Sequence, residues 1–304
     1  MPSWIEIDKE VRSAPSALDA VRQKYLRRLH KLTGRNVLAY YSGWLQKPDA
    51  PFYWTSVGDD DKNGFMAALH GLDRGKGLDL ILHTPGGDVA ATESLVEYLH
   101  QMFPRGGAGL RAIVPQLAMS AGTMIALGCE VIVLGKHSSL GPIDPQVGGR
   151  PAGAFIEEFD RAHEECRDDP ARLALWQLII SKYPPAFLFE CEKALEWSRA
   201  MVRDWLAARM FHAEPQAADL AEQVTAALVD HSRTLSHARH IGLAALQEMG
   251  LAVVALEADD RLQEAVLSVH HAMVQTLGST GAAKIVENHL GVATITMLHS
   301  TVNR

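Results

Sequence analysis

Apolar residues in the first half of the chain alternate between two spacings. Residues 17–32 repeat apolar side chains at helical spacing, and residues 36–43 form an apolar run that ends at Gly43 and favours a strand. Further strands are predicted at 78–83, 110–114 and 131–134, with helices at 89–103 and 121–127 between them. Strands and helices in this order predict right-handed βαβ crossovers and a parallel sheet that is buried on both faces.

The second half of the chain has mostly helical spacing. Helices are predicted at 152–167, 171–181, 185–212, 217–230, 236–249 and 259–277, with one strand at 251–256. We therefore expect three parts: an N-terminal helical segment (1–34), an α/β core (35–150), and a helical extension (151–304) that completes the fold.

Composition and charge narrow the class of protein. The 304 residues are 47% hydrophobic and 21% charged, which is typical of a globular protein. A net charge of −7 gives no electrostatic reason to expect a nucleic-acid partner. The three cysteines lack zinc-binding spacing, and no apolar run is long enough for a membrane span. These features predict a cytoplasmic protein without a membrane span.

Two unusual loops follow neighbouring predicted strands. In a parallel sheet, ligands bind at the carboxyl ends of the strands. After the strand 78–83, the loop Thr84-Pro-Gly-Gly-Asp88 removes two side chains where backbone N–H groups could approach a negative oxygen, which suggests an oxyanion hole. A plain strand-to-helix turn is the simpler explanation of Gly86 and Gly87 alone.

The second loop places Ser120 between a strand and an apolar helix. Small residues flank it in Ala118-Met-Ser-Ala-Gly-Thr123, and this is the location of an exposed nucleophilic serine in strand-turn-helix sites. The alternative is a serine that only caps the helix. The two loops together favour the nucleophile, because they bring a serine and oxyanion donors to one edge of one sheet.

Three motifs in order carry a resemblance to a known family. They are Leu-Ile-Leu-His-Thr-Pro-Gly-Gly-Asp (80–88), Val-Pro-Gln-Leu-Ala-Met-Ser-Ala-Gly-Thr-Met-Ile-Ala-Leu (114–127) and Ser-Ser-Leu-Gly-Pro-Ile-Asp-Pro-Gln (138–146). Together they resemble the serine dehydrogenase proteinase family, which is similar to signal peptide peptidase A within the Clp protease and crotonase superfamily. The resemblance implies an α/β core of repeated ββα units, with Ser120 as nucleophile. It also implies that the N–H groups of Gly87 and Ala121 hold the oxyanion, and that Gly86 turns the loop.

The general base is the open question. The Clp proteases have a histidine near the point where this chain has Asp144, so the resemblance favours the serine-lysine dyad of the signal peptide peptidases. A lysine acts as base only when an apolar environment lowers its pKa, and Lys182 lies in the apolar segment Leu-Ile-Ile-Ser-Lys-Tyr (178–183). Asp144, His83 and His137 are further candidates, and Asp144 could also orient the base or bind a substrate amine. Lys182 could instead cap a helix C-terminus.

Half of the fourteen histidines follow residue 230. His237 and His240 would share a helical face, with His231 before them and His270 and His271 after them, so a metal site is conceivable. The pattern lacks the glutamate of the metalloprotease motif, and a surface or subunit interface is the simpler interpretation. No metal and no cofactor are expected; the Gly-rich segment 106–109 precedes a strand, which is the wrong order for a nucleotide loop.

The leading hypothesis is a serine peptidase that forms an acyl-enzyme on Ser120 and uses Lys182 as base. The resemblance also implies a homo-oligomer with peptide or protein substrates. One alternative keeps the fold and makes it a crotonase-like acyl-CoA enzyme, in which paired N–H groups stabilise an enolate. The other alternative is a non-catalytic scaffold, in which Ser120 only caps a helix.

Overall fold

A seven-stranded sheet forms the centre of the protein. The computed structural model describes residues 7, 17–229 and 236–298. Neighbouring strands in the sheet follow the order β11, β10, β1, β2, β3, β5, β9. The sheet strands are β1 (Asn36–Ser42), β2 (Leu78–His83), β3 (Leu110–Val114), β5 (Val131–Leu134), β9 (Val253–Ala255), β10 (Ala282–Asn288) and β11 (Ala293–Met297). The five strands from β1 to β9 are parallel, as the sequence predicts, and β10 and β11 add an antiparallel edge.

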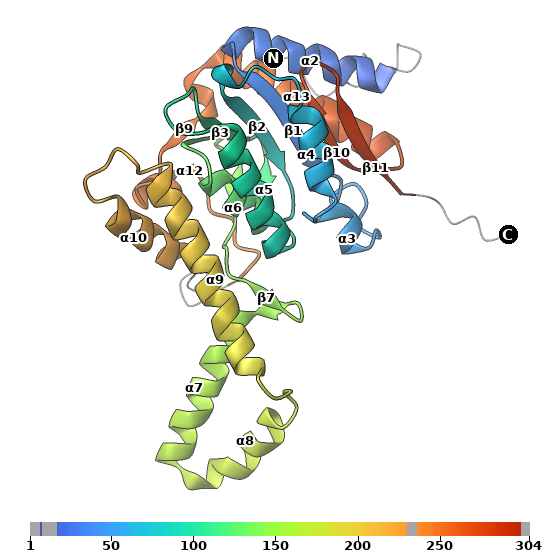
Figure 1. Cartoon of the computed structure of the whole chain (residues 1–304). Helices are drawn as coiled ribbons and strands as arrows, with labels where there is room; N and C mark the ends of the chain where they lie inside the picture. Colours follow the sequence, from blue (N-terminus) through green and yellow to red (C-terminus); the bar gives the residue numbers. More distant parts are fainter. Residues whose placement is uncertain (1–6, 8–16, 230–235, 299–304) are drawn as a thin grey trace, which may run out of the picture.

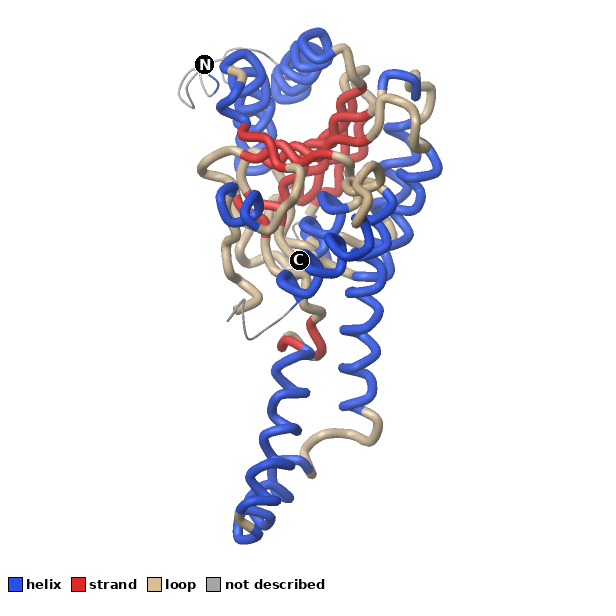
Figure 2. Tube along the Cα trace, turned by 90° about the vertical axis from the view of Figure 1, so that its left-hand side faces the viewer, coloured by secondary structure: helices blue, strands red, loops and turns tan. Residues whose placement is uncertain are grey.

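Helices cover both faces of this sheet (Figure 2), which explains why every residue of β1 and β2 is buried. One face packs against α4 (Asp61–Leu69), α5 (Val89–Met102), α6 (Ala121–Leu127) and parts of α9 (Phe187–Ala208), α10 (Ala217–Val229) and α12 (Leu243–Glu248). The other face packs against α2 (Ala17–Thr33) and α13 (Asp260–Ser279). The predicted mixed α/β class with a parallel sheet is therefore confirmed.

A buried ion pair joins α2 to the C-terminal part of the chain. Arg22 is 1% exposed, and its Nε donates to Glu287 of β10 at 2.6 Å while its Nη1 donates to Thr276 of α13 at 3.0 Å. A buried guanidinium needs such partners, because an unpaired buried charge is strongly destabilising. The predicted N-terminal helix thus packs against elements more than 250 residues away in sequence.

The chain after residue 250 is less helical than the sequence suggested. Strands β10 and β11 were not predicted, and β10 contains charged residues where a buried strand usually has apolar ones. Lys284 is 1% exposed and pairs with Asp61 of α4 at 2.8 Å, so its partner comes from a distant element. The helix predicted at 236–249 is also wrong in extent, since only α12 (Leu243–Glu248) is helical among its described residues.

An arm of helices projects from the body (Figures 1 and 2). The short antiparallel strands β7 (Gln146–Val147) and β8 (Arg150–Pro151) lead into α7 (Ala152–Asp168), which is followed by α8 (Leu173–Ile180) and by the returning helix α9. Phe155 of α7 packs edge-on against Tyr183 and Phe187, with ring centroids 5.7 and 4.7 Å away. The predicted helical extension is therefore partly an arm and partly a layer of the body.

Histidines and aromatic rings form a cluster at the end of β2. The ring of His83 lies at a tilt to those of Tyr41 and Trp44, with centroids 5.4 and 4.5 Å away, and edge-on to that of His270 at 5.3 Å. The hydroxyl of Tyr41 is 3.2 Å from Nδ1 of His270. Burial lowers the pKa of His83 to about 3 and also lowers the pKa of His270 well below its ordinary value. Both rings are therefore neutral in the folded protein near pH 7.

This cluster predicts acid sensitivity of the fold. A histidine buried in neutral form binds its proton only after unfolding, so the unfolded state binds more protons as the pH falls below about 6.5. We expect the free energy of unfolding to fall between pH 6.5 and 4 by about 1.4 kcal/mol per pH unit for each such ring. Urea unfolding at a series of pH values measures this slope.

Two variants test whether the buried histidines cause this pH dependence of stability. His83→Phe should make the slope shallower, whereas His163→Gln should not change it, because His163 is exposed on α7. An equal slope in the wild type and in His83→Phe would contradict the prediction.

Candidate functional site

A second row of backbone pairing brings together the loops that follow the sheet strands. Val57 pairs with Gly87, Thr84 with Ala118, and Leu140 with Ile241, each through an isolated bridge. Between them, β4 (Leu117–Ala118) pairs in parallel with β6 (Ser139–Leu140). We call this row the loop platform. It joins five chain segments, and the predicted convergence of the loops at one edge of the sheet is therefore confirmed.

Two glycines allow the first loop to lie against the second. Gly86 has a φ of +101°, and a Cβ at this position would lie 2.7 Å from Cβ of Ser120. A Cβ on Gly87 would lie 2.3 Å from the backbone nitrogen and oxygen of Val57. Neither contact is possible for a larger residue without a shift of the backbone. The Gly-Gly pair is required by the close approach of three backbone segments.

Ser120 has a backbone conformation that serine rarely adopts. Its φ of 50° and ψ of −116° match the first central residue of a type II′ turn, where glycine is usual, and the N–H of Gly122 closes the turn by donating to Met119 at 2.8 Å. Such strain costs about 1–3 kcal/mol and is concentrated at functional sites. The Ser120 side chain makes no capping hydrogen bond to α6. The alternative of a simple helix cap is therefore not what the geometry shows.

Backbone donors lie beside this serine. In the part of the chain that the structure describes, the N–H groups of Gly87 and Ala121 have no hydrogen-bond acceptor, although the neighbouring Asp88 N–H donates to Val57 at 2.9 Å. Thr123 of α6 fixes the surrounding loops, because its hydroxyl donates to Ala118 at 2.8 Å and accepts from Gly141 N–H at 2.9 Å. Free donors on a rigid loop are what an oxyanion hole requires.

Asp144 is paired with a histidine that the sequence analysis weighed only as a metal ligand or surface residue. The antiparallel bridge between Leu140 and Ile241 brings their two segments side by side, and Nδ1 of His237 lies 2.7 Å from Oδ1 of Asp144. The Asp144 side chain is fully buried, and that of His237 is 27% exposed. Because a carboxylate can only accept, Nδ1 donates and the neutral ring keeps Nε2 as an acceptor.

A cavity of about 230 Å³ lies at this edge of the sheet. The first loop and α5 supply one side of it, and α6, the loop at Asp144 and α9 supply the rest. Its lining residues are Gly87, Asp88, Val89, Ala90, Ser120, Met124, Ile143, Asp144, Pro145, Gln146, Ala194, Trp197 and Ser198. The cavity therefore contains Ser120, Gly87 and Asp144 of the predicted site residues.

The remaining candidate bases lie elsewhere in this chain. Lys182 is exposed in the turn after α8, on the arm, and does not line the cavity. His83 is buried in the aromatic cluster, and His137 is half exposed with Nδ1 3.9 Å from Glu257. Neither histidine lines the cavity. Of the C-terminal histidines, His231 lies outside the described residues.

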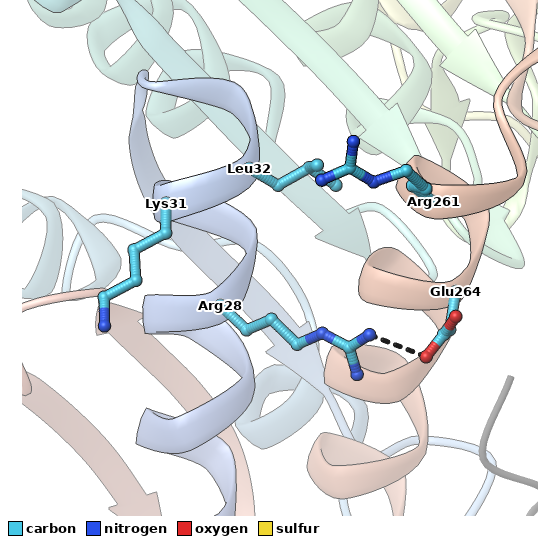
Figure 3. A pocket seen from close by; sticks show the side chains of 5 residues that line it. All are labelled: Arg28, Lys31, Leu32, Arg261 and Glu264. Carbon is cyan, nitrogen blue, oxygen red and sulfur yellow. Dashed lines mark hydrogen bonds and ion pairs between the residues drawn. The ribbon is translucent and has the colours of Figure 1, made fainter.

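A second cavity, of about 250 Å³, lies between α2 and α13 (Figure 3). It is lined by Arg28, Lys31, Leu32, Arg261 and Glu264, and Arg28 donates to Glu264 at 2.7 Å. The Lys31 side chain points away from that ion pair. No residue that the sequence analysis singled out lies here.

Within residues 7, 17–229 and 236–298, no group of three or more His, Cys, Asp or Glu side chains is arranged to hold a metal ion. Over the same part of the chain, each helix is too short or too polar to cross a membrane.

A strained serine beside free backbone donors, at the carboxyl edge of a parallel sheet, is the arrangement of hydrolases that form a covalent intermediate. The family model of ClpP-like SDH-type serine proteinases matches residues 14–258, and the chain belongs to this family. The match extends from α2 through β9, so it covers both the loop platform and the arm.

Two similar proteins come from Methanocaldococcus jannaschii. The uncharacterized protein MJ0137 is 36% identical over 110 residues, which are 36% of this chain and 37% of that protein. The uncharacterized protein MJ1495 is 28% identical over 194 residues, which are 64% of this chain and 58% of that protein. The matched part thus spans less than two thirds of the length of either relative.

The strain at Ser120 predicts an unusual effect on stability. We expect the free energy of unfolding of Ser120→Gly to be about 1 kcal/mol higher than that of Ser120→Ala, because glycine accepts this φ and alanine does not. This difference already includes the opposing entropy that glycine gains in the unfolded chain. Denaturant unfolding of the two variants measures the difference. A glycine variant no more stable than the alanine variant would show that the turn is not strained.

Proposed function

We propose that this protein is a serine peptidase that forms an acyl-enzyme on Ser120. The observation that carries the proposal is the strained Ser120 turn, which shares one cavity with the Gly87 loop and Asp144. Family membership supports the class of reaction, and the substrate would be a peptide or protein.

The proposed reaction has two stages, which are acylation of Ser120 and hydrolysis of the acyl ester. Ser120 Oγ attacks the carbonyl carbon of the substrate, and its proton passes to a base. The N–H groups of Gly87 and Ala121 hold the negative oxygen of the tetrahedral intermediate. The C–N bond then breaks, and the amine leaves with the proton. Water then attacks the carbonyl carbon of the acyl ester and loses a proton to the base. The bond between that carbon and Ser120 Oγ breaks, the base returns the proton to Oγ, and the acid product leaves.

The base has two candidates in this proposal. Asp144 lines the cavity together with Ser120, and His237, which does not itself line it, is paired with Asp144, so the pair can accept one proton at this side of the cavity. Lys182 would make the enzyme a serine-lysine dyad of the signal peptide peptidase type. Its exposed place on the arm, outside the cavity, makes the Asp144–His237 pair the better supported candidate within one chain.

Self-assembly and cellular location belong to the same proposal. Exposed apolar side chains on the arm support a homo-oligomer, since large exposed apolar patches usually mark contacts. They are Leu173, Leu175 and Leu178 of α8 and Phe189 of α9, each between 49% and 69% exposed. A cytoplasmic location remains an expectation from the sequence.

A crotonase-like acyl-CoA enzyme is the second candidate function. The observation that favours it is a carboxylate, Asp144, in the same cavity as the free backbone donors. Such an enzyme would keep its activity in Ser120→Ala, because the serine would not enter the reaction. A scaffold without catalytic activity would have an unactivated Ser120, which would not react with a serine-directed probe.

A fluorophosphonate probe tests the acyl-enzyme. We expect one probe molecule per chain, attached to Ser120, and no labelling of Ser120→Ala, because only an activated serine reacts with the phosphorus centre. Intact mass and peptide mapping measure the site. Unlabelled wild-type protein at every pH from 6 to 10 would overturn the proposal.

The base is tested by two further variants. His237→Gln keeps a polar side chain of similar size but removes the proton acceptor, and we expect the labelling rate of Ser120 to fall at least about 100-fold. Lys182→Met should label at the wild-type rate. The reverse pattern would assign the role to Lys182 and establish the serine-lysine dyad instead.

A further inference from the structure

One wall of the Ser120 cavity comes from the arm. Ala194, Trp197 and Ser198 of α9 line the same cavity as Gly87, Asp88 and the first residues of α5. Trp197 is anchored there, because its Nε1 donates to Glu93 of α5 at 3.2 Å. The returning helix of the arm therefore helps to shape the space next to the nucleophile.

Ser198 is the unusual residue of this wall. It is fully buried, and its Oγ has no hydrogen-bond partner among the residues that the structure describes. A serine within a helix commonly bonds to the carbonyl four residues earlier, which would satisfy it. A buried hydroxyl left without a partner costs about 1–3 kcal/mol. A ligand that brings a polar group to this position removes that cost.

The rest of the cavity limits the size and character of such a ligand. Met124 and Ile143 are each 1% exposed and give it an apolar floor. A volume of about 230 Å³ suits one amino-acid side chain rather than a larger ligand, since pockets for drug-sized molecules begin near 300 Å³. The substrate group nearest to Ser120 is the side chain on the acyl side of the bond that is cleaved.

We propose that Ser198 is a specificity-determining residue, and that the cavity binds an acyl-side residue with a short polar tip, such as asparagine, in preference to the apolar isostere leucine. This inference rests on the proposed peptidase function. The side-chain body packs against Met124 and Ile143, and the amide pairs with the Ser198 hydroxyl. Discrimination by one buried neutral hydrogen bond is about tenfold.

Two matched peptide amides test the inference, identical except for asparagine or leucine on the acyl side of a fluorogenic leaving group. We expect the wild type to cleave the asparagine peptide with a kcat/KM about tenfold higher. Ser198→Ala should remove this preference, mainly by slowing the asparagine peptide. Ser181→Ala, which removes an exposed hydroxyl on the arm, should keep it.

Ala194→Leu tests whether the cavity holds that side chain at all. Leucine at this half-buried helical position fills the cavity, so cleavage of both peptides should slow relative to a peptide with glycine on the acyl side. Fluorophosphonate labelling of every variant separates the two proposals. If Ser120 is labelled but Ser198→Ala keeps the wild-type ratio of kcat/KM for the two peptides, Ser198 does not determine specificity, and the peptidase function stands. If Ser120 is not labelled, the peptidase function itself fails.

Discussion

The backbone pairing of the loop platform is the constraint on which the candidate site depends. The main sheet brings strand ends to one edge, but it leaves the loops after them free to diverge. The bridges at Gly87, Ala118 and Ile241 tie these loops to one another. Because they are backbone contacts, they fix the position of N–H groups as well as side chains. The free donors and the serine are consequences of that pairing.

Close backbone approach also explains the local sequence of the site. Gly86 and Gly87 lack side chains because Ser120 and Val57 occupy the space that a Cβ would need. Ser120 then takes a turn position that favours glycine, so the fold carries strain at one residue. A strained residue persists only where its surroundings hold it, and Thr123 supplies two of the bonds that do so.

Sequence reasoning found those parts of the site whose signal is local. Ser120 and the Gly-Gly loop were identified from their place between strands and helices, and the structure brings them together with Asp144. The pairing of His237 with Asp144 was not predicted, because the two residues are 93 positions apart and the segment of His237 had a helical pattern. The missed strand β10 has the same cause: Lys284 is buried only because Asp61 meets it from another element. The signal available in the sequence was a charged residue in a proline-rich loop, Asp144, which needs a partner when it is buried. His237 was one of the residues that could supply one.

The sequence by itself determined the five parallel strands, most of the helices packed on them and the loops at the sheet edge, because apolar periodicity and glycine placement are local properties. Only the tertiary structure decided which distant residues become partners. It set His237 against Asp144, left Lys182 on an exposed arm, and brought Ser198 of that arm's return helix to the cavity. Such pairings depend on how helices and loops pack across the sheet, and no pattern within one segment encodes them.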